Sequence, residues 1–124
     1  MKETILVFQL EDPSEKLALE TVLFPYHVRL KKIKLEQYTQ NLGALAGLWE
    51  EDPEAVPAET ALDAPMLIFA GIPDAKLNQM LAGLRKRGIQ IPYKAILTPT
   101  NATWTPLVCF EEIRREHEAM HTKN

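Results

Sequence analysis

The sequence predicts one small α/β domain, residues 1–124, with a four-stranded, mostly parallel sheet flanked by helices. Residues 4–10 and 66–71 are nearly continuous apolar runs, which is typical of strands covered on both faces. A helical pattern follows each run, and a shorter strand-like segment follows each helix. This alternation favours right-handed crossovers between parallel strands. Two central and two peripheral strands predict the spatial order 2-1-3-4.

The first helix and the second strand are predicted from residues 12–34. Asp12 is a suitable N-cap, and Pro13 suits the first helical position. The helix is expected to bury an apolar stripe and to end before Pro25. The stripe consists of Leu17, Ala18, Thr21, Val22 and Phe24. Residues 28–34 alternate apolar and basic side chains, which predicts a half-exposed strand whose charges protect a sheet edge.

Residues 35–48 carry leucines at helical spacing but also contain Gly43 and Gly47, so we expect a short helix of low intrinsic stability. Residues 49–65 form an acidic, proline-rich segment without Lys or Arg, and its prolines predict a loop. The acidic residues are Glu50, Glu51, Asp52, Glu54, Glu59 and Asp63. The second strand supplies a basic strip, Arg29, Lys31, Lys32 and Lys34. The strip could pair with the loop of the same chain, or across a homodimer.

In the second half, a helix is expected to begin at Pro73 and Asp74 and to end before Gly88. Its buried stripe consists of Leu77, Met80, Leu81 and Leu84. Residues 94–97 predict the fourth strand, and a last helix is expected to begin near residues 104–106.

A ferredoxin-like α+β plait is the alternative fold. In that fold the second and third strands pair antiparallel, and a short hairpin is their natural connection. The segment between residues 34 and 66 is long enough for a crossover, which favours the parallel arrangement.

Composition and charge exclude several classes of function. The net charge of −3 and the pI near 5.6 give no general attraction to nucleic acid or to an anionic membrane, so neither is expected as a partner. The sequence has no signal-peptide pattern, and no apolar run approaches the length of a membrane span. We therefore expect a cytoplasmic protein. A lone Cys109, read as a buried thiol, fits that reducing compartment.

The segment His117-Glu118-Ala119-Met120-His121 matches the H-E-x-x-H pattern of zinc hydrolases. On a helix both imidazoles lie on one side and can share a Zn²⁺ ion, while the Glu118 carboxylate activates a water. A metal-dependent hydrolase is therefore the alternative function. Three residues follow the pattern, so a third protein ligand would have to come from elsewhere. The structural explanation is that His117 extends the core-facing stripe of Phe110 and Ile113.

Ligands of open α/β sheets bind outside the carboxyl ends of the strands, where the strand order reverses. In the expected order this point lies between the first and third strands, and the loops after strands one, three and four should meet there. Small polar side chains and helix N-termini at this rim could hold an anion or a carboxylate. The candidate ligand-binding residues are Thr98, Thr100, Asn101, Thr103, Asp12 and Asp74. Capping and turn roles also explain these residues without any ligand.

Residues 94–104, K-A-I-L-T-P-T-N-A-T-W, are continued by Glu116-His117 and Met120-His121. Together they resemble a family of small bacterial proteins described as a domain of unknown function, with a K-A-x-L-T-P-T-N-x-x-W signature. The resemblance takes in residues 42–47 and 66–88 and covers most of the chain beyond residue 40. It implies no activity, cofactor or catalytic residue. It places Thr98, Thr100, Asn101 and Trp104 together in the signature.

These observations favour a cytoplasmic binding or interaction module over an enzyme. The expected partner is a protein or a small molecule, bound at the rim formed by the strand ends. No cofactor is expected, since Zn²⁺ belongs only to the hydrolase alternative.

Overall fold

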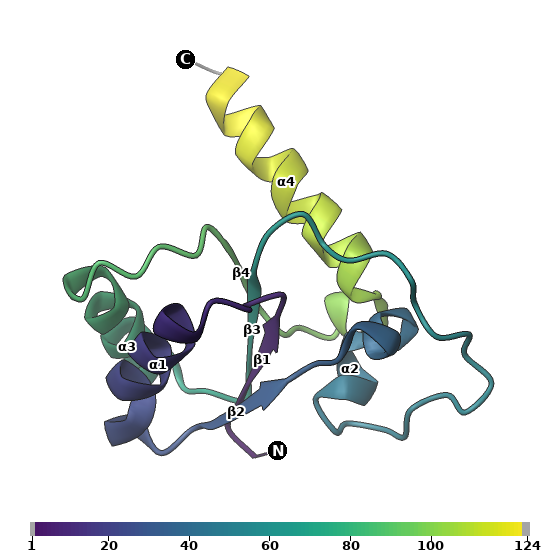
Figure 1. The fold of residues 1–124 in the computed structure, drawn as a ribbon, viewed down its shortest axis with the longest axis horizontal. Helices are drawn as coiled ribbons and strands as arrows, with labels where there is room; N and C mark the ends of the chain where they lie inside the picture. The colour runs from purple at the N-terminus through teal and green to yellow at the C-terminus, as the bar shows by residue number, and fades with distance from the viewer. Residues whose placement is uncertain (1, 123–124) are drawn as a thin grey trace.

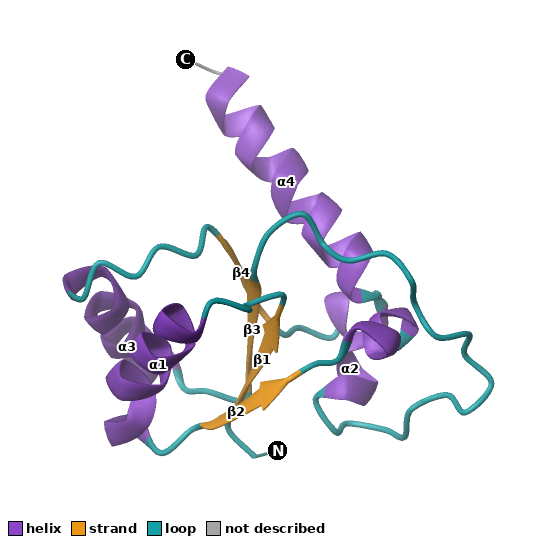
Figure 2. Ribbon diagram, viewed as in Figure 1, coloured by secondary structure: helices purple, strands orange, loops and turns teal. Residues whose placement is uncertain are grey.

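The structure is a computed structural model that describes residues 2–122, and their side chains as far as residue 120. The chain forms a four-stranded sheet with helices on both faces (Figures 1 and 2). In chain order the elements are β1 (Thr4–Phe8), α1 (Pro13–Leu23), η1 (Phe24–Tyr26), β2 (Arg29–Lys32), η2 (Leu35–Thr39), α2 (Leu42–Leu45), β3 (Met66–Ala70), α3 (Asp74–Lys86), β4 (Tyr93–Ile96), η3 (Asn101–Thr103) and α4 (Pro106–Thr122), where η marks a short 3-10 helix.

The expected α/β class and the strand order 2-1-3-4 are confirmed. Strands β1 and β2 pair in parallel, as do β3 and β4, so the sheet is mostly parallel. The two central strands, however, run antiparallel, with Thr4 opposite Ala70 and Phe8 opposite Met66. The prediction that β1 and β3 run in the same direction is therefore wrong. The ferredoxin-like alternative is wrong as well, because β2 lies at a sheet edge and does not pair with β3.

The path of the chain after β2 explains the antiparallel centre. The connection between residues 33 and 65 leaves the sheet edge at which β1 and β2 end. It packs η2 and α2 on one face and then returns to that same edge, where Met66 pairs with Phe8. A connection that begins and ends at the same end of the sheet joins antiparallel strands. A crossover between parallel strands must instead return to the opposite end of the sheet. Segment length alone permits both outcomes.

The sheet separates two hydrophobic clusters, because side chains of a strand alternate between its faces. Helices α1 and α3 cover one face, and α2 and α4 cover the other (Figure 2). The cluster under α1 and α3 contains Ile5, Val7, Leu10, Leu19, Leu23, Leu67, Phe69, Leu77, Met80, Leu84 and Ile91. The cluster under α2 and α4 contains Leu6, Phe8, Ile33, Tyr38, Leu42, Leu45, Leu62, Met66, Ile68, Cys109, Phe110 and Ile113.

The two halves of the sheet repeat one strand–helix–strand unit. In each half the inner strand pairs in parallel with the outer strand that follows it, β1 with β2 and β3 with β4. The antiparallel register places Leu6 opposite Ile68 at its centre, so an approximate two-fold axis through this pair relates the two units.

Backbone conformation repeats with the topology. The residue directly after each inner strand has a positive φ, 62° at Gln9 and 71° at Gly71. The connection from helix to outer strand also contains one such residue in each unit, His27 with φ 56° and Gly88 with φ 80°. This region of φ favours glycine, so Gln9 and His27 hold a backbone shape that is less favourable for their side chains.

Helix α1 begins as predicted, with the Asp12 carboxylate accepting a hydrogen bond from the backbone N–H of Ser14 at 2.8 Å. Its buried face was predicted wrongly. Leu19 and Leu23 are the buried residues of the helix, whereas Leu17 is 65% exposed. Phe24 is 78% exposed, because the chain changes to a 3-10 turn at that residue and the spacing of the stripe no longer holds.

The other elements follow the sequence closely. The predicted helix at residues 35–48 is divided into η2 and α2, and no helix or strand occurs between residues 46 and 65. Helix α3 buries Leu77, Met80 and Leu84 as expected. Helix α4 packs on the sheet through its first half, and its C-terminal half extends beyond the body of the molecule (Figure 1). Within residues 2–122, no helix has the length and apolarity needed to cross a membrane.

Candidate functional site

Because the two central strands are antiparallel, the residues of the predicted rim lie at two opposite ends of the sheet, where different strands end. Because β3 and β4 are parallel, Asp74 and the segment from Thr98 follow strands that end at one edge. Strand β1 ends at the other edge, and Asp12 follows it there. The expectation that the three loops meet at one rim is therefore wrong. It rested on a common strand direction that this sheet does not have.

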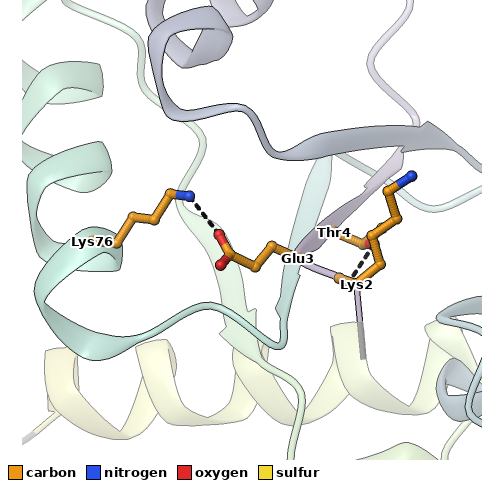
Figure 3. A network of polar contacts seen from close by, with 4 residues as sticks. All are labelled: Lys2, Glu3, Thr4 and Lys76. Atoms are coloured by element: carbon orange, nitrogen blue, oxygen red, sulfur yellow. Dashed lines mark hydrogen bonds and ion pairs between the residues drawn. The ribbon is translucent and has the colours of Figure 1, made fainter.

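At the edge of Asp74 and Thr98, polar contacts tie the start of the chain to α3 (Figure 3). The Lys76 ammonium donates to the Glu3 carboxylate at 2.5 Å. The Thr4 hydroxyl donates to the backbone carbonyl of Lys2 at 2.9 Å. These contacts hold the first strand against α3.

Asn101 closes the end of the outer edge of β4. Leu97 N donates to the Phe69 carbonyl at 2.8 Å, so alternate residues, among them Ile96 and Thr98, turn their backbone groups away from β3. The Asn101 Nδ2 donates to the Ile96 carbonyl at 2.9 Å, and its Oδ1 accepts from Thr98 N at 2.8 Å. The carboxamide thus takes the place of a peptide group in a fifth strand. With 8% of its surface exposed, Asn101 serves the fold.

The neighbouring threonines have local hydrogen bonds. Thr98 Oγ1 accepts from Asn101 N at 3.1 Å, and Thr103 Oγ1 donates to the Thr100 carbonyl at 3.1 Å. Asp12 caps α1, and Asp74 is the first residue of α3. Turn and cap roles explain these positions. That Thr98, Thr100, Asn101, Thr103, Asp12 and Asp74 bind a ligand stays a prediction.

The H-E-x-x-H segment lies on α4, as predicted. The His117 ring is half-buried and lies against the Tyr93 ring, with 5.5 Å between ring centroids, which agrees with its structural explanation. The side chain of His121 lies outside the described ones. Among the described residues no group of three or more His, Cys, Asp or Glu side chains could hold a metal ion. Zinc binding by His117 and His121, with Glu118 as base, stays a prediction.

Cys109 lies on the inner face of α4 and is 1% exposed. Burial raises the pKa of its thiol to about 11, and the carboxylates of Glu116 and Glu112 add to the increase. A thiol with this pKa remains protonated at neutral pH and is a poor nucleophile. The expectation of a buried thiol is confirmed.

Strand β2 is the other outermost strand of the sheet, and its outer side is more open than that of β4. Arg29 N donates to the Glu3 carbonyl and Ile33 N to the Val7 carbonyl, so the backbone groups of the alternate residues Leu30 and Lys32 face outward. Within residues 2–122, no other segment hydrogen-bonds to the outward groups of these two residues.

Gln37 holds the position in the first unit that Asn101 holds in the second. Its Oε1 accepts from the N–H of Lys34 at 3.0 Å, as Asn101 does from Thr98. Its Nε2, however, donates to Glu51 at 3.2 Å and not to a carbonyl of the strand. Gln37 therefore closes only the end of the β2 edge.

A hollow of about 560 Å³ lies beside the start of β2. Its apolar lining comes from the end of α1 and from the strand: Leu23, Phe24, Val28 and Leu30. Its other lining residues are Lys2, Glu20, His27 and Arg29. Sequence reasoning missed this hollow because it placed Phe24 in the buried stripe. The available signal was Pro25, which ends the helix and releases Phe24 from the helical spacing.

The basic strip does not pair with the acidic loop of the same chain. Among the described residues, Arg29, Lys32 and Lys34 form no ion pair, and Lys31 Nζ donates to the Leu45 carbonyl at 2.7 Å. The loop is held elsewhere, since Arg114 of α4 binds the Asp63 carboxylate at 2.5 Å. Pairing of the strip with a second copy stays a prediction.

The fold and its edges define a small α/β domain of two strand–helix–strand units. One edge strand, β4, has its end closed by Asn101, and the other, β2, is the more open. Residues 65–120 match the model of a family described as a domain of unknown function, DUF3783. The match runs from β3 through most of α4 and takes in the second unit alone. No curated protein and no solved structure matches the chain.

The family match agrees with the resemblance to a domain of unknown function, and residues 94–104 lie within it. Residues 42–47, which the resemblance also included, lie outside the matched range. The family description assigns no activity, so function must be inferred from the surface of the molecule.

Proposed function

We propose that this protein is a binding module that captures a peptide segment of another protein at the hollow beside β2. The observation that carries the proposal is Phe24, which is 78% exposed and lines a hollow together with Leu23, Val28 and Leu30. Single apolar residues on flat surfaces are common and have no special meaning. An exposed aromatic side chain beside a hollow that other apolar residues line is, in contrast, typical of interaction sites.

This proposal moves the binding site from the strand ends near Asn101 to the β2 edge. The resemblance to bacterial proteins and the buried thiol of Cys109 support a bacterial protein of the reducing cytoplasm. No observation on the described part of α4 favours the hydrolase over a binding module.

The test is a selection of random displayed peptides on the immobilised full-length chain. The proposal predicts enriched peptides whose binding is weakened by Phe24→Ser. Leu17→Ser is the matched control, because Leu17 belongs to α1 and is also exposed, at 65%, but does not line the hollow. Ser in either place leaves the buried clusters unchanged, so both variants should fold.

Enrichment that Phe24→Ser reduces and Leu17→Ser leaves unchanged would support the proposal. A selection that enriches nothing over the bare support, or peptides that bind both variants as well as the parent chain, would overturn it.

A further inference from the structure

We infer that the occupant of the β2 edge is an extended, acidic peptide segment that pairs with the strand and extends the sheet. The inference rests on the proposed function and adds the mode of binding and the chemistry of the partner. It depends on the backbone of β2, on the charges around it, and on the contrast with β4.

The backbone of β2 offers the groups that a further strand needs. Leu30 and Lys32 both turn N–H and C=O outward, and the described chain supplies no partner for them. An added strand is held by hydrogen bonds to such groups, and pockets beside the edge select its side chains. The hollow with Phe24 and Leu30 is such a pocket.

The charges of β2 select an acidic partner. Three of the four residues of Arg29–Lys32 are cations, and successive side chains of a strand point to opposite faces. Arg29 and Lys31 therefore lie toward the face of α2 and α4, and Lys32 lies toward the face of α1 and α3. Glu20 is the carboxylate that lines the hollow. A strand with acidic side chains would meet a cation on each face of the sheet.

The same charges oppose pairing of β2 with the β2 of a second copy, because like charges directly opposite each other destabilise a strand pair. The β4 edge is the poorer alternative. Asn101 occupies Ile96 O and Thr98 N, and Pro92 has no N–H to donate, so within the described chain the outward groups of Lys94 and the N–H of Ile96 are what this edge offers. The more open edge and the more cationic edge are therefore the same strand.

The probe is the synthetic peptide Val-Glu-Asp-Val-Glu-Asp-Val, which as a strand places carboxylates on both faces of the sheet. Its control is the isosteric neutral peptide Val-Gln-Asn-Val-Gln-Asn-Val. Binding to the full-length chain is measured by calorimetry at low and high salt, and the site is mapped by backbone NMR. The acidic peptide should bind more tightly than the neutral one, by about tenfold at low salt, and the difference should shrink as salt rises.

Two changes separate strand pairing from simple charge attraction. Lys32→Gln removes the charge and keeps the outward N–H, so affinity should fall about threefold. Lys32→Pro also removes the N–H, so affinity should fall by about tenfold or more, and Lys94→Pro on β4 is the matched control that leaves it unchanged. N-methylation of alternate peptide residues tests the same hydrogen bonds without any change in the protein. One set of N-methyl positions should abolish binding and the other should not.

Equal binding of the acidic and neutral peptides, or retention of binding by both N-methylated peptides, would overturn the inference. NMR shifts that lie away from Leu30 and Lys32 would overturn it as well. If the display selection still yields Phe24-dependent peptides in that case, strand pairing fails while the binding module stands. If the selection yields none, both fail.

Discussion

The two edges of the sheet belong to equivalent units, but their outer backbone groups are treated differently. On β4, Asn101 bonds both Ile96 O and Thr98 N. On β2, Gln37 bonds Lys34 N, and its amide nitrogen is directed to Glu51. A sheet edge with unpaired groups invites association, so proteins close edges that are not used. The comparison teaches that one unit can close the end of its edge strand with a side chain while its repeat leaves the corresponding backbone group, the Lys32 carbonyl, available.

The largest expected effect concerns Asn101 at the end of β4. Asn101→Ala removes two part-buried hydrogen bonds, to the Ile96 carbonyl and from the Thr98 N–H, and empties the place of a side chain that is 8% exposed. The free energy of unfolding should fall by about 2–3 kcal/mol. Asn101→Asp keeps the acceptor and loses the donor, so its free energy of unfolding should lie between those of the parent chain and of Asn101→Ala. Urea denaturation followed by circular dichroism measures all three proteins.

The matched variant is Gln37→Ala, which removes the corresponding bonds of the half-buried Gln37 near β2 and should cost less than about 1 kcal/mol. Equal losses for the two alanine variants would show that the edges do not differ as described.

A smaller effect is expected from Cys109, which lies buried on the inner face of α4. The pKa of this thiol is raised from 9.0 to about 11, so the folded chain keeps its proton in a range where the unfolded chain loses it. The stabilising contribution is complete below pH 9 and is lost as pH rises toward 11. It amounts to about 1–2 kcal/mol.

The difference in unfolding free energy between the parent chain and Cys109→Ala isolates this effect, since other groups also titrate at high pH. A difference that stays constant between pH 8 and pH 11 would contradict the burial of the thiol. A thiol alkylated at neutral pH as fast as a free cysteine would contradict it too.

Much of the fold could be predicted from the sequence, because local signals determine most elements. The apolar runs of β1 and β3, the Asp12 cap and the stripe of α3 each depend on neighbouring residues, and each was found. The direction of β3 relative to β1 depends on the path of the long connection, which contains no local signal. The prediction that three loops meet at one rim was wrong for that reason.

The candidate site was less accessible to sequence reasoning. Asn101 was singled out as polar and close to a strand end, but polarity does not distinguish a ligand-binding amide from one that pairs with its own strand. Phe24 was assigned to the core because its helical spacing was extrapolated across the end of α1. The openness of β2 requires knowledge of which residues face outward, and the pairing register alone supplies it.

Hydrogen exchange of single backbone amides, followed by NMR on the free full-length chain, tests the contrast between the edges most directly. The amides of Leu30 and Lys32 should exchange rapidly, and that of Thr98 should exchange slower by on the order of a hundred-fold, since Asn101 must release it first. Protection of Leu30 and Lys32 equal to that of Thr98 would show that the β2 edge is already occupied, and would contradict the account.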